Sequence, residues 1–115
     1  MASYELVEES PTHTVVKLSG QLDAAGIGAV ENPLTFRVTA RRRPTIVDMA
    51  GVTFVGSLAI GTLVMIAKSL RHFQAALVLE SVAPPIAQAL KQAGISEILP
   101  IASDRAHALQ LIGVA

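Results

Sequence analysis

The chain has 115 residues, no cysteine, and nine basic residues balanced by nine acidic ones, so its formal net charge is zero. This length fits one domain that can bury a core without cross-links. The lack of cysteine excludes disulfides and thiolate metal sites, and the balanced charge gives no general attraction to nucleic acid or acidic lipid. Hydrophobic residues make up 51% of the chain, which favours a surface that meets a partner.

The segments that could be mistaken for membrane or targeting sequences have the wrong properties. The most apolar stretch, residues 58–67, has ten residues, whereas a helix needs about twenty to span a bilayer. The first ten residues, MASYELVEES, are polar and acidic, unlike a signal peptide. We therefore expect a soluble, cytoplasmic protein that does not insert into a membrane.

The chain opens with a pattern typical of a hairpin. Residues 4–7 predict a weak strand, and residues 14–18 predict a stronger one because they are rich in β-branched side chains. Between them, residues 10–13 have a turn composition. Gly20 is expected to end the second strand.

A helix is predicted next, over about residues 24–42. Asp23 is a plausible N-cap for it. We expect this helix to be broken or kinked because it contains several poor helix formers, namely Gly26, Gly28 and Pro33. The arginines at 41–43 favour a solvated helix end, where cations are stabilised by the helix dipole.

The middle of the chain predicts a strand, a loop and an apolar helix. Residues 44–49 form a short run bounded by turn formers, which is typical of a buried strand. Residues 51–56 predict a loop, and Ser57 begins a helix that runs to about Phe73. This helix is apolar nearly all round, so we expect part of it to reach an interface.

The last third continues the alternation of strands and helices. It predicts a strand over 75–79, a helix over 84–93, a strand over 98–101 and a final helix capped by Ser103 or Asp104 that runs to about 112. The resulting order, β-β-α-β-α-β-α-β-α, predicts an α/β fold with a mostly parallel sheet of about five strands and about four helices.

Catalytic and metal-binding patterns are scarce. The three histidines, His13, His72 and His107, lack metal-ligand spacing, and each is interpreted as a lone surface residue. Residues 26–28, Gly-Ile-Gly, are a weak dinucleotide signal because the third glycine is missing. We expect no enzyme activity, no metal and no cofactor.

Two acidic residues, Asp23 and Asp48, fall at the ends of predicted strands and could approach each other in space. A strand-end aspartate is more often a cap or turn residue.

Ser57 has two interpretations on local grounds. It follows a strand and a short apolar loop and sits where backbone N–H groups and the helix dipole would tolerate a phosphate. Its hydroxyl could equally serve as a plain helix cap, worth about 1 kcal/mol.

Three segments together resemble the STAS domain family, named for sulphate transporters and anti-sigma factor antagonists. Residues 48–63, DMAGVTFVGSLAIGTL, are similar to the family pattern D-L-S-G-V followed by F-[IM]-D-S-[ST]-G-L-G-x-L. Residues 18–23, LSGQLD, are similar to its L-x-G-x-L-D. Residues 81–86, SVAPPI, precede a helix as in the family. The resemblance covers essentially the whole chain, 1–115, and implies a single STAS domain.

The resemblance implies a function in bacterial signal transduction and transcription regulation. Anti-sigma factor antagonists bind an anti-sigma factor that is also a serine kinase, and phosphorylation of the serine at the helix start separates the partners. Ser57 falls on that serine, and Asp23 on the family's loop aspartate. The residues expected to meet the partner are Asp23, Gly56, Ser57, Leu58, Ile60 and Gly61.

The sequence departs from the family pattern around this serine. The family's Asp before it is Gly56, the residue after it is Leu58, and the next glycine is Ala59. These changes leave open a second function, that of a STAS scaffold or accessory subunit of a signalling assembly or transporter without a covalent switch. Homo-oligomerisation and nucleotide binding near Asp23 and Ser57 also stay open.

Overall fold

The protein is described by a computed structural model that covers residues 2–113. Its elements are β1 (Ser3–Glu9), β2 (Thr14–Leu22), α1 (Ala24–Arg41), β3 (Thr45–Val55), α2 (Ser57–Arg71), β4 (Leu77–Glu80), α3 (Pro84–Gln92), β5 (Ile101–Ala102) and α4 (Arg105–Leu111). The order of strands and helices is the predicted one. The predicted α/β class, with five strands and four helices, is confirmed.

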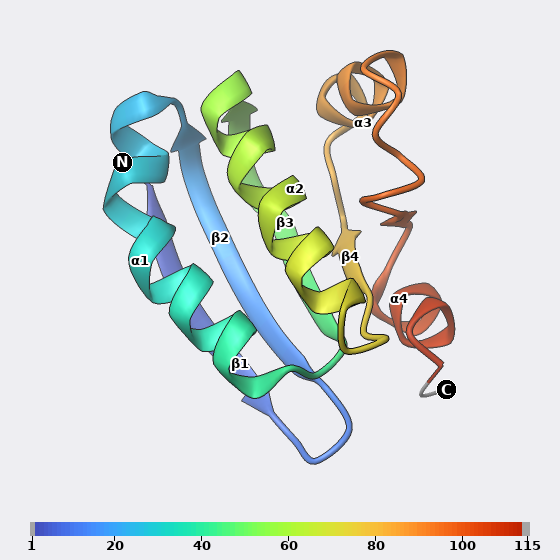
Figure 1. Cartoon of the computed structure of the whole chain (residues 1–115). Coiled ribbons are helices and arrows are strands. Elements are labelled where there is room, and N and C mark those ends of the chain that lie inside the picture. The colour runs from blue at the N-terminus through green and yellow to red at the C-terminus, as the bar shows by residue number, and fades with distance from the viewer. Residues whose placement is uncertain (1, 114–115) are drawn as a thin grey trace.

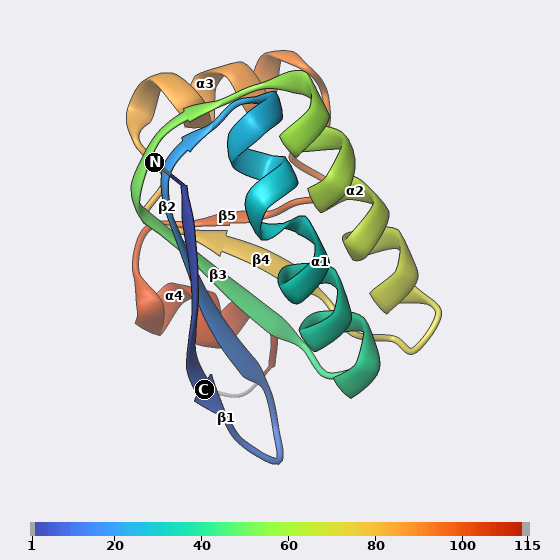
Figure 2. The same cartoon turned by 90° about the vertical axis from the view of Figure 1, so that its left-hand side faces the viewer.

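The five strands form one mixed sheet in the order β1-β2-β3-β4-β5. The β1–β2 hairpin is antiparallel, and all later pairs are parallel. In Figure 1, α1 and α2 lie side by side across one face of the sheet, and Figure 2 shows α4 on the opposite face. Parallel strands joined by helices need both faces of the sheet covered, which this arrangement provides.

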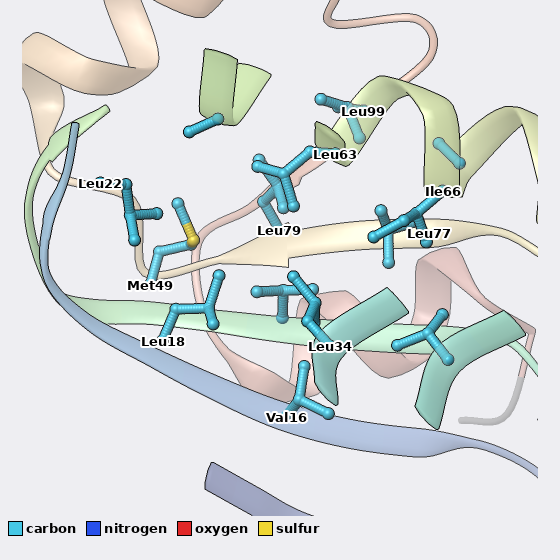
Figure 3. Close-up of a cluster of buried hydrophobic side chains, with 14 of the residues drawn as sticks. Val16, Leu18, Leu22, Leu34, Met49, Leu63, Ile66, Leu77, Leu79 and Leu99 are labelled. Carbon is cyan, nitrogen blue, oxygen red and sulfur yellow. The ribbon is translucent and has the colours of Figure 1, made fainter. Parts of the chain in front are cut away.

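The main core lies between the sheet and the α1–α2 layer. Side chains from β2 and β3 meet side chains from both helices there, and Figure 3 shows Val16 and Leu18 facing Leu34, with Leu63 and Ile66 nearby. Leu18, Leu34 and Leu63 are at most 1% exposed, and burial of each such side chain contributes about 1.5–3 kcal/mol. A smaller cluster, which includes Val15, Ile46, Val78 and Ala108, lies under α4.

The two central strands are longer than predicted. The predicted end of β2 at Gly20 is wrong, because the strand continues to Leu22 through Gly20 with a positive φ of 89°. The predicted loop over 51–56 is also wrong, because β3 runs on to Val55. The two extensions pair with each other, Leu22 beside Val55, across register shifts that mark bulges.

Asp48 therefore lies inside β3, not at its end, and does not approach Asp23. Its register partners are Lys17 and Glu80, and its Oδ1 accepts a hydrogen bond of 2.9 Å from the Ala50 backbone N–H. Asp23 follows Leu22, seven residues further along β3 in the register.

The expected break in α1 does not occur, since the helix is continuous from Ala24 to Arg41. Val30, Leu34 and Val38 hold one face of it in the core at 3% exposure or less. Pro33 lies on the exposed side of the helix. Proline has no N–H to donate to the Ala29 carbonyl, but on this side water can donate to that carbonyl instead.

The β1–β2 hairpin packs against the end of α1 and corrects two predictions. His13 is not a surface residue: it is 7% exposed, and its Nδ1 lies 2.8 Å from the Thr12 hydroxyl. Arg41 is not merely solvated, because it donates to the Ser10 carbonyl and, at 2.9 Å, to the Thr14 hydroxyl. These contacts close the hairpin onto the helix.

An ion pair anchors α4 to the sheet. Arg105 donates two hydrogen bonds to Glu80, of 2.5 and 3.0 Å, and Glu80 is 4% exposed. This pairing raises the pKa of Arg105. Asp104 caps α4 by accepting from the His107 N–H at 2.8 Å, and β5 lies at Ile101–Ala102, later than the predicted 98–101.

Candidate functional site: the paired starts of α1 and α2

The extensions of β2 and β3 bring the starts of α1 and α2 together. Leu22 and Val55 pair in the sheet, and the Gly56 N–H donates to the Leu22 carbonyl at 2.9 Å. Asp23 and Ser57, which each lie close after these residues, therefore stand at the same edge of the sheet. The two helices run on side by side from this edge (Figure 1). The structure thus unites residues that the sequence separates by more than thirty positions.

Asp23 holds the start of α1 in place. Its Oδ1 accepts a hydrogen bond of 2.8 Å from the Gly26 N–H, which confirms the predicted N-cap. Gly26 lies so close to β2 that a Cβ built on it would be 1.9 Å from the Gln21 carbonyl oxygen. The helix can pack here only because residue 26 has no side chain.

Ser57 is the first residue of α2 and not its cap. Gly56 is the N-cap, with an extended backbone at φ −91° and ψ 175°, and no side chain caps the helix. The cap interpretation of the Ser57 hydroxyl is therefore wrong. Ser57 is exposed, and backbone N–H groups of the first turn of α2 are left to solvent or to a ligand.

The rest of the first turn is open on one side and packed on the other. Leu58 is 62% exposed and Ala59 is fully buried. Ile60 is half-buried and Gly61 exposed. One turn further on, Met65 is 56% exposed. Because residues 58, 61 and 65 share one helix face, α2 presents an apolar stripe to solvent. An interface on this helix stays a prediction.

A shallow apolar cavity of about 240 Å³ adjoins this turn. It lies between the end of β3, α2 and α3, and its lining includes Phe54, Ile60, Ile86 and Leu90. Phe54 is 49% exposed. Phe54 at this site could not be predicted from local patterns, because residues 51–56 have the composition of a loop and not of a strand.

A polar contact joins the two helices below their starts. The Thr62 hydroxyl donates to Glu31 Oε2 at 2.8 Å, and Thr62 is 6% exposed. The sequence analysis predicted a role for neither residue, because they lie 31 residues apart and no local pattern connects them. This bond fixes α2 against α1 one turn after Ser57.

Within residues 2–113, no three His, Asp or Glu side chains are placed to hold a metal ion. Over the same span, no helix has both the length and the apolar character to cross a membrane. The site is therefore an exposed helix start with apolar neighbours and one carboxylate, Asp23, engaged in capping.

The fold and site define a single α/β domain with a mixed five-stranded sheet and a serine at an open helix start. The sequence model of the STAS domain matches residues 4–108, and the chain belongs to the STAS domain family.

Individual relatives carry related names. The chain is 26% identical over 88 residues to the putative anti-sigma factor antagonist BtrV of Bordetella bronchiseptica, covering 76% of each chain. The crystal structure of an anti-sigma factor antagonist from Mycobacterium paratuberculosis shares the fold, with a TM-score of 0.83, 20% identity and coverage of 97% of this chain and 94% of that one. The unphosphorylated anti-sigma factor antagonist SpoIIAA matches with a TM-score of 0.78, 14% identity and coverage of 98% and 99%. SpoIIAA from Bacillus is also known in a phosphorylated form.

Proposed function

We propose that this protein is an anti-sigma factor antagonist that binds an anti-sigma factor with serine kinase activity through the surface around the first turn of α2. The surface comprises Asp23, Gly56, Ser57, Leu58, Ile60 and Gly61. The observation that carries the proposal is the first turn itself: Ser57 is exposed without a capping role, beside a leucine that is 62% exposed. The relative BtrV and the structural neighbours that bear this name support the proposal.

Phosphorylation of Ser57 would switch this surface off. The kinase would transfer the γ-phosphoryl group of ATP to Ser57 Oγ: a new P–O bond forms, the bond to the bridging oxygen of ADP breaks, and the hydroxyl proton passes to a base of the kinase. The open position of Ser57 leaves its oxygen accessible to such an enzyme.

The free protein can carry the phosphate, whereas the complex cannot accommodate it well. The phosphate adds about −1.5 to −2 charges, and the start of α2 stabilises a negative charge by about 0.3–1 kcal/mol. In the complex, the same group would be buried beside Leu58 and Ile60, where an unpaired charge is costly. Within the described residues, none of the ion pairs lies at the starts of α1 and α2, so none of the paired cations would offset a phosphate on Ser57. The difference between the two states is what releases the partner.

The test uses the full chain and the kinase that co-purifies with it from its native cells. Incubation with ATP is expected to place one phosphate on Ser57, seen by mass spectrometry, and Ser57→Asp is expected to weaken binding at least about tenfold. Ser103→Asp is the matched control, because it adds the same charge at an exposed serine beside the start of α4. Equal binding by both aspartate variants would refute the site.

The alternative, a STAS scaffold without a covalent switch, is favoured by one observation. Gly56 stands where the family pattern has an acidic residue, and the nearby Asp23 carboxylate is engaged by the Gly26 N–H. The same incubation separates the two functions: a scaffold would bind its partner through Leu58 while Ser57 stays unmodified. Loss of binding in Leu58→Glu, together with an unphosphorylated Ser57, would support the scaffold.

A further inference from the structure

The ends of α1 and α2 form a basic edge, which consists of Arg42, Arg43, Lys68 and Arg71. All four side chains are exposed. The two helices end side by side at the bottom of Figure 1. The contact of Arg42 with Phe73 joins these ends, since the guanidinium carbon lies 4.5 Å from the centre of the ring. In the sequence, only the three consecutive arginines at 41–43 indicated a basic surface. The fold brings Lys68 and Arg71 of α2 to the same edge.

The helix ends alone do not account for this much positive charge. Each helix C-terminus carries about half a negative charge, so two of them offset about one of the four cations. Arg37 and Arg41 nearby are paired with Glu9. Among residues 2–113, none of the four cations of the basic edge forms an ion pair. A surplus of positive charge therefore faces solvent here, although the whole chain is neutral.

The chemistry of the edge indicates the kind of ligand. Three of the four cations are arginines, whose planar forks suit carboxylates and phosphates. The four cations are all exposed, and the two cavities beside Asp23 and Ile60 lie elsewhere; a small free anion is held best in an enclosed site. An extended anionic ligand fits better.

The neighbours of the edge and its small size indicate the class of ligand. Glu9 lies on the hairpin side, bonded to Arg37 at 3.2 Å. Glu97 lies on the other, where its carbonyl accepts from Arg71 at 3.0 Å. The edge offers four cations on a chain whose net charge is zero. So small a basic surface suits a short acidic peptide better than the extended phosphate array of a bilayer or a nucleic-acid duplex, which is bound by larger basic surfaces.

We propose that the basic edge binds an acidic segment of a partner protein. Packed helix axes are about 8–10 Å apart, and an extended chain advances about 3.3 Å per residue. Asp or Glu residues two or three positions apart would therefore reach the cations of both helices. The edge is separate from Ser57, because the 15 residues of α2 span about 22 Å. The two surfaces can be occupied together.

The experiment titrates the full chain with a labelled peptide of about ten residues that alternates Glu and Ser. Exposed ion pairs contribute about 0.2–1 kcal/mol each, so we expect Lys68→Glu to weaken binding about threefold and Lys68→Glu with Arg43→Glu about tenfold. Added salt should weaken wild-type binding strongly.

Lys91→Glu is the matched control. Lys91 is exposed in the last turn of α3 as Lys68 is in the last turn of α2, but α3 lies at the opposite end of the molecule (Figure 1). It should leave the affinity within about 1.5-fold. Equal losses in Lys68→Glu and Lys91→Glu would overturn the proposal, as would tighter binding to phosphatidylserine vesicles or a DNA duplex than to the peptide.

Discussion

Replacement of Gly26 by alanine tests the packing that positions the proposed binding surface. The new Cβ would start 1.9 Å from the Gln21 carbonyl oxygen, and contacts under 3.0 Å are essentially never seen. The start of α1 must therefore retreat by at least about 1 Å. Because the obstacle is backbone and not a flexible side chain, β2 or α1 has to move.

The magnitude follows from three contributions. Overpacking costs about 1–3 kcal/mol, and the displaced helix start endangers the Asp23 cap, worth about 1 kcal/mol. The higher helix propensity of alanine returns about 0.5–1 kcal/mol. We expect Gly26→Ala to lower the free energy of unfolding by about 1–3.5 kcal/mol.

Gly28→Ala is the control for this change. It lies one half-turn away in the same helix and is exposed, and a Cβ there meets nothing within 4 Å. It should raise the free energy of unfolding by about 0.5–1 kcal/mol. Urea unfolding of both variants with unchanged slope measures the difference. If Gly26→Ala were as stable as Gly28→Ala, the close approach of α1 to Gln21 would be disproved.

Two further predictions concern the helices that flank the site. Pro33→Ala should raise the free energy of unfolding by about 1–3 kcal/mol, because the helix already continues through residue 33 and regains a hydrogen bond to Ala29; no gain in thermal unfolding would show that the bond stays unformed. Arg105→Met should cost about 3 kcal/mol by leaving the buried Glu80 carboxylate unpaired, more than Glu80→Gln, which leaves a partly exposed guanidinium; the reverse order in urea unfolding would contradict this. The pKa of Arg105 is raised in the folded state. The stabilisation that its positive charge contributes is therefore complete below the pKa of the unfolded state and is lost only as the pH rises through the pKa of the folded state. The contribution of Arg105 to the free energy of unfolding should therefore be constant between about pH 5 and pH 10.

The order of elements could be predicted from local patterns, whereas their lengths at the site could not. The β-branched run at 14–18 and the apolar run at 44–49 indicated the strands. The continuation of both strands past Gly20 and Gly51 depends on the pairing of one extension with the other. Such pairing is a property of two distant segments, so glycine-containing stretches that look like turns can complete a sheet.

The helices show the same contrast between local and tertiary causes. Asp23 caps α1 as predicted, and of the two candidates for α4, Ser103 and Asp104, the cap is Asp104. Both caps could be predicted because a cap depends on residues three positions away. Pro33 predicted a break that the burial of Leu34 and Val38 overrides. The prediction of His13 as a surface residue is wrong, because its burial depends on the β1–β2 hairpin closing onto α1.

The position of Ser57 links these two kinds of cause. Had β3 ended near Asp48, residues 51–56 would have been a loop and Ser57 could have served as the cap of α2. Because β3 runs to Val55 and the Gly56 N–H bonds to Leu22, Gly56 becomes the cap and Ser57 moves into the first turn with its hydroxyl uncommitted. At this position the dipole of α2 would stabilise a negative charge on the side chain by about 0.3–1 kcal/mol. The pairing of the strand ends therefore determines that Ser57 stands in the first turn of α2 with a hydroxyl that has no capping role.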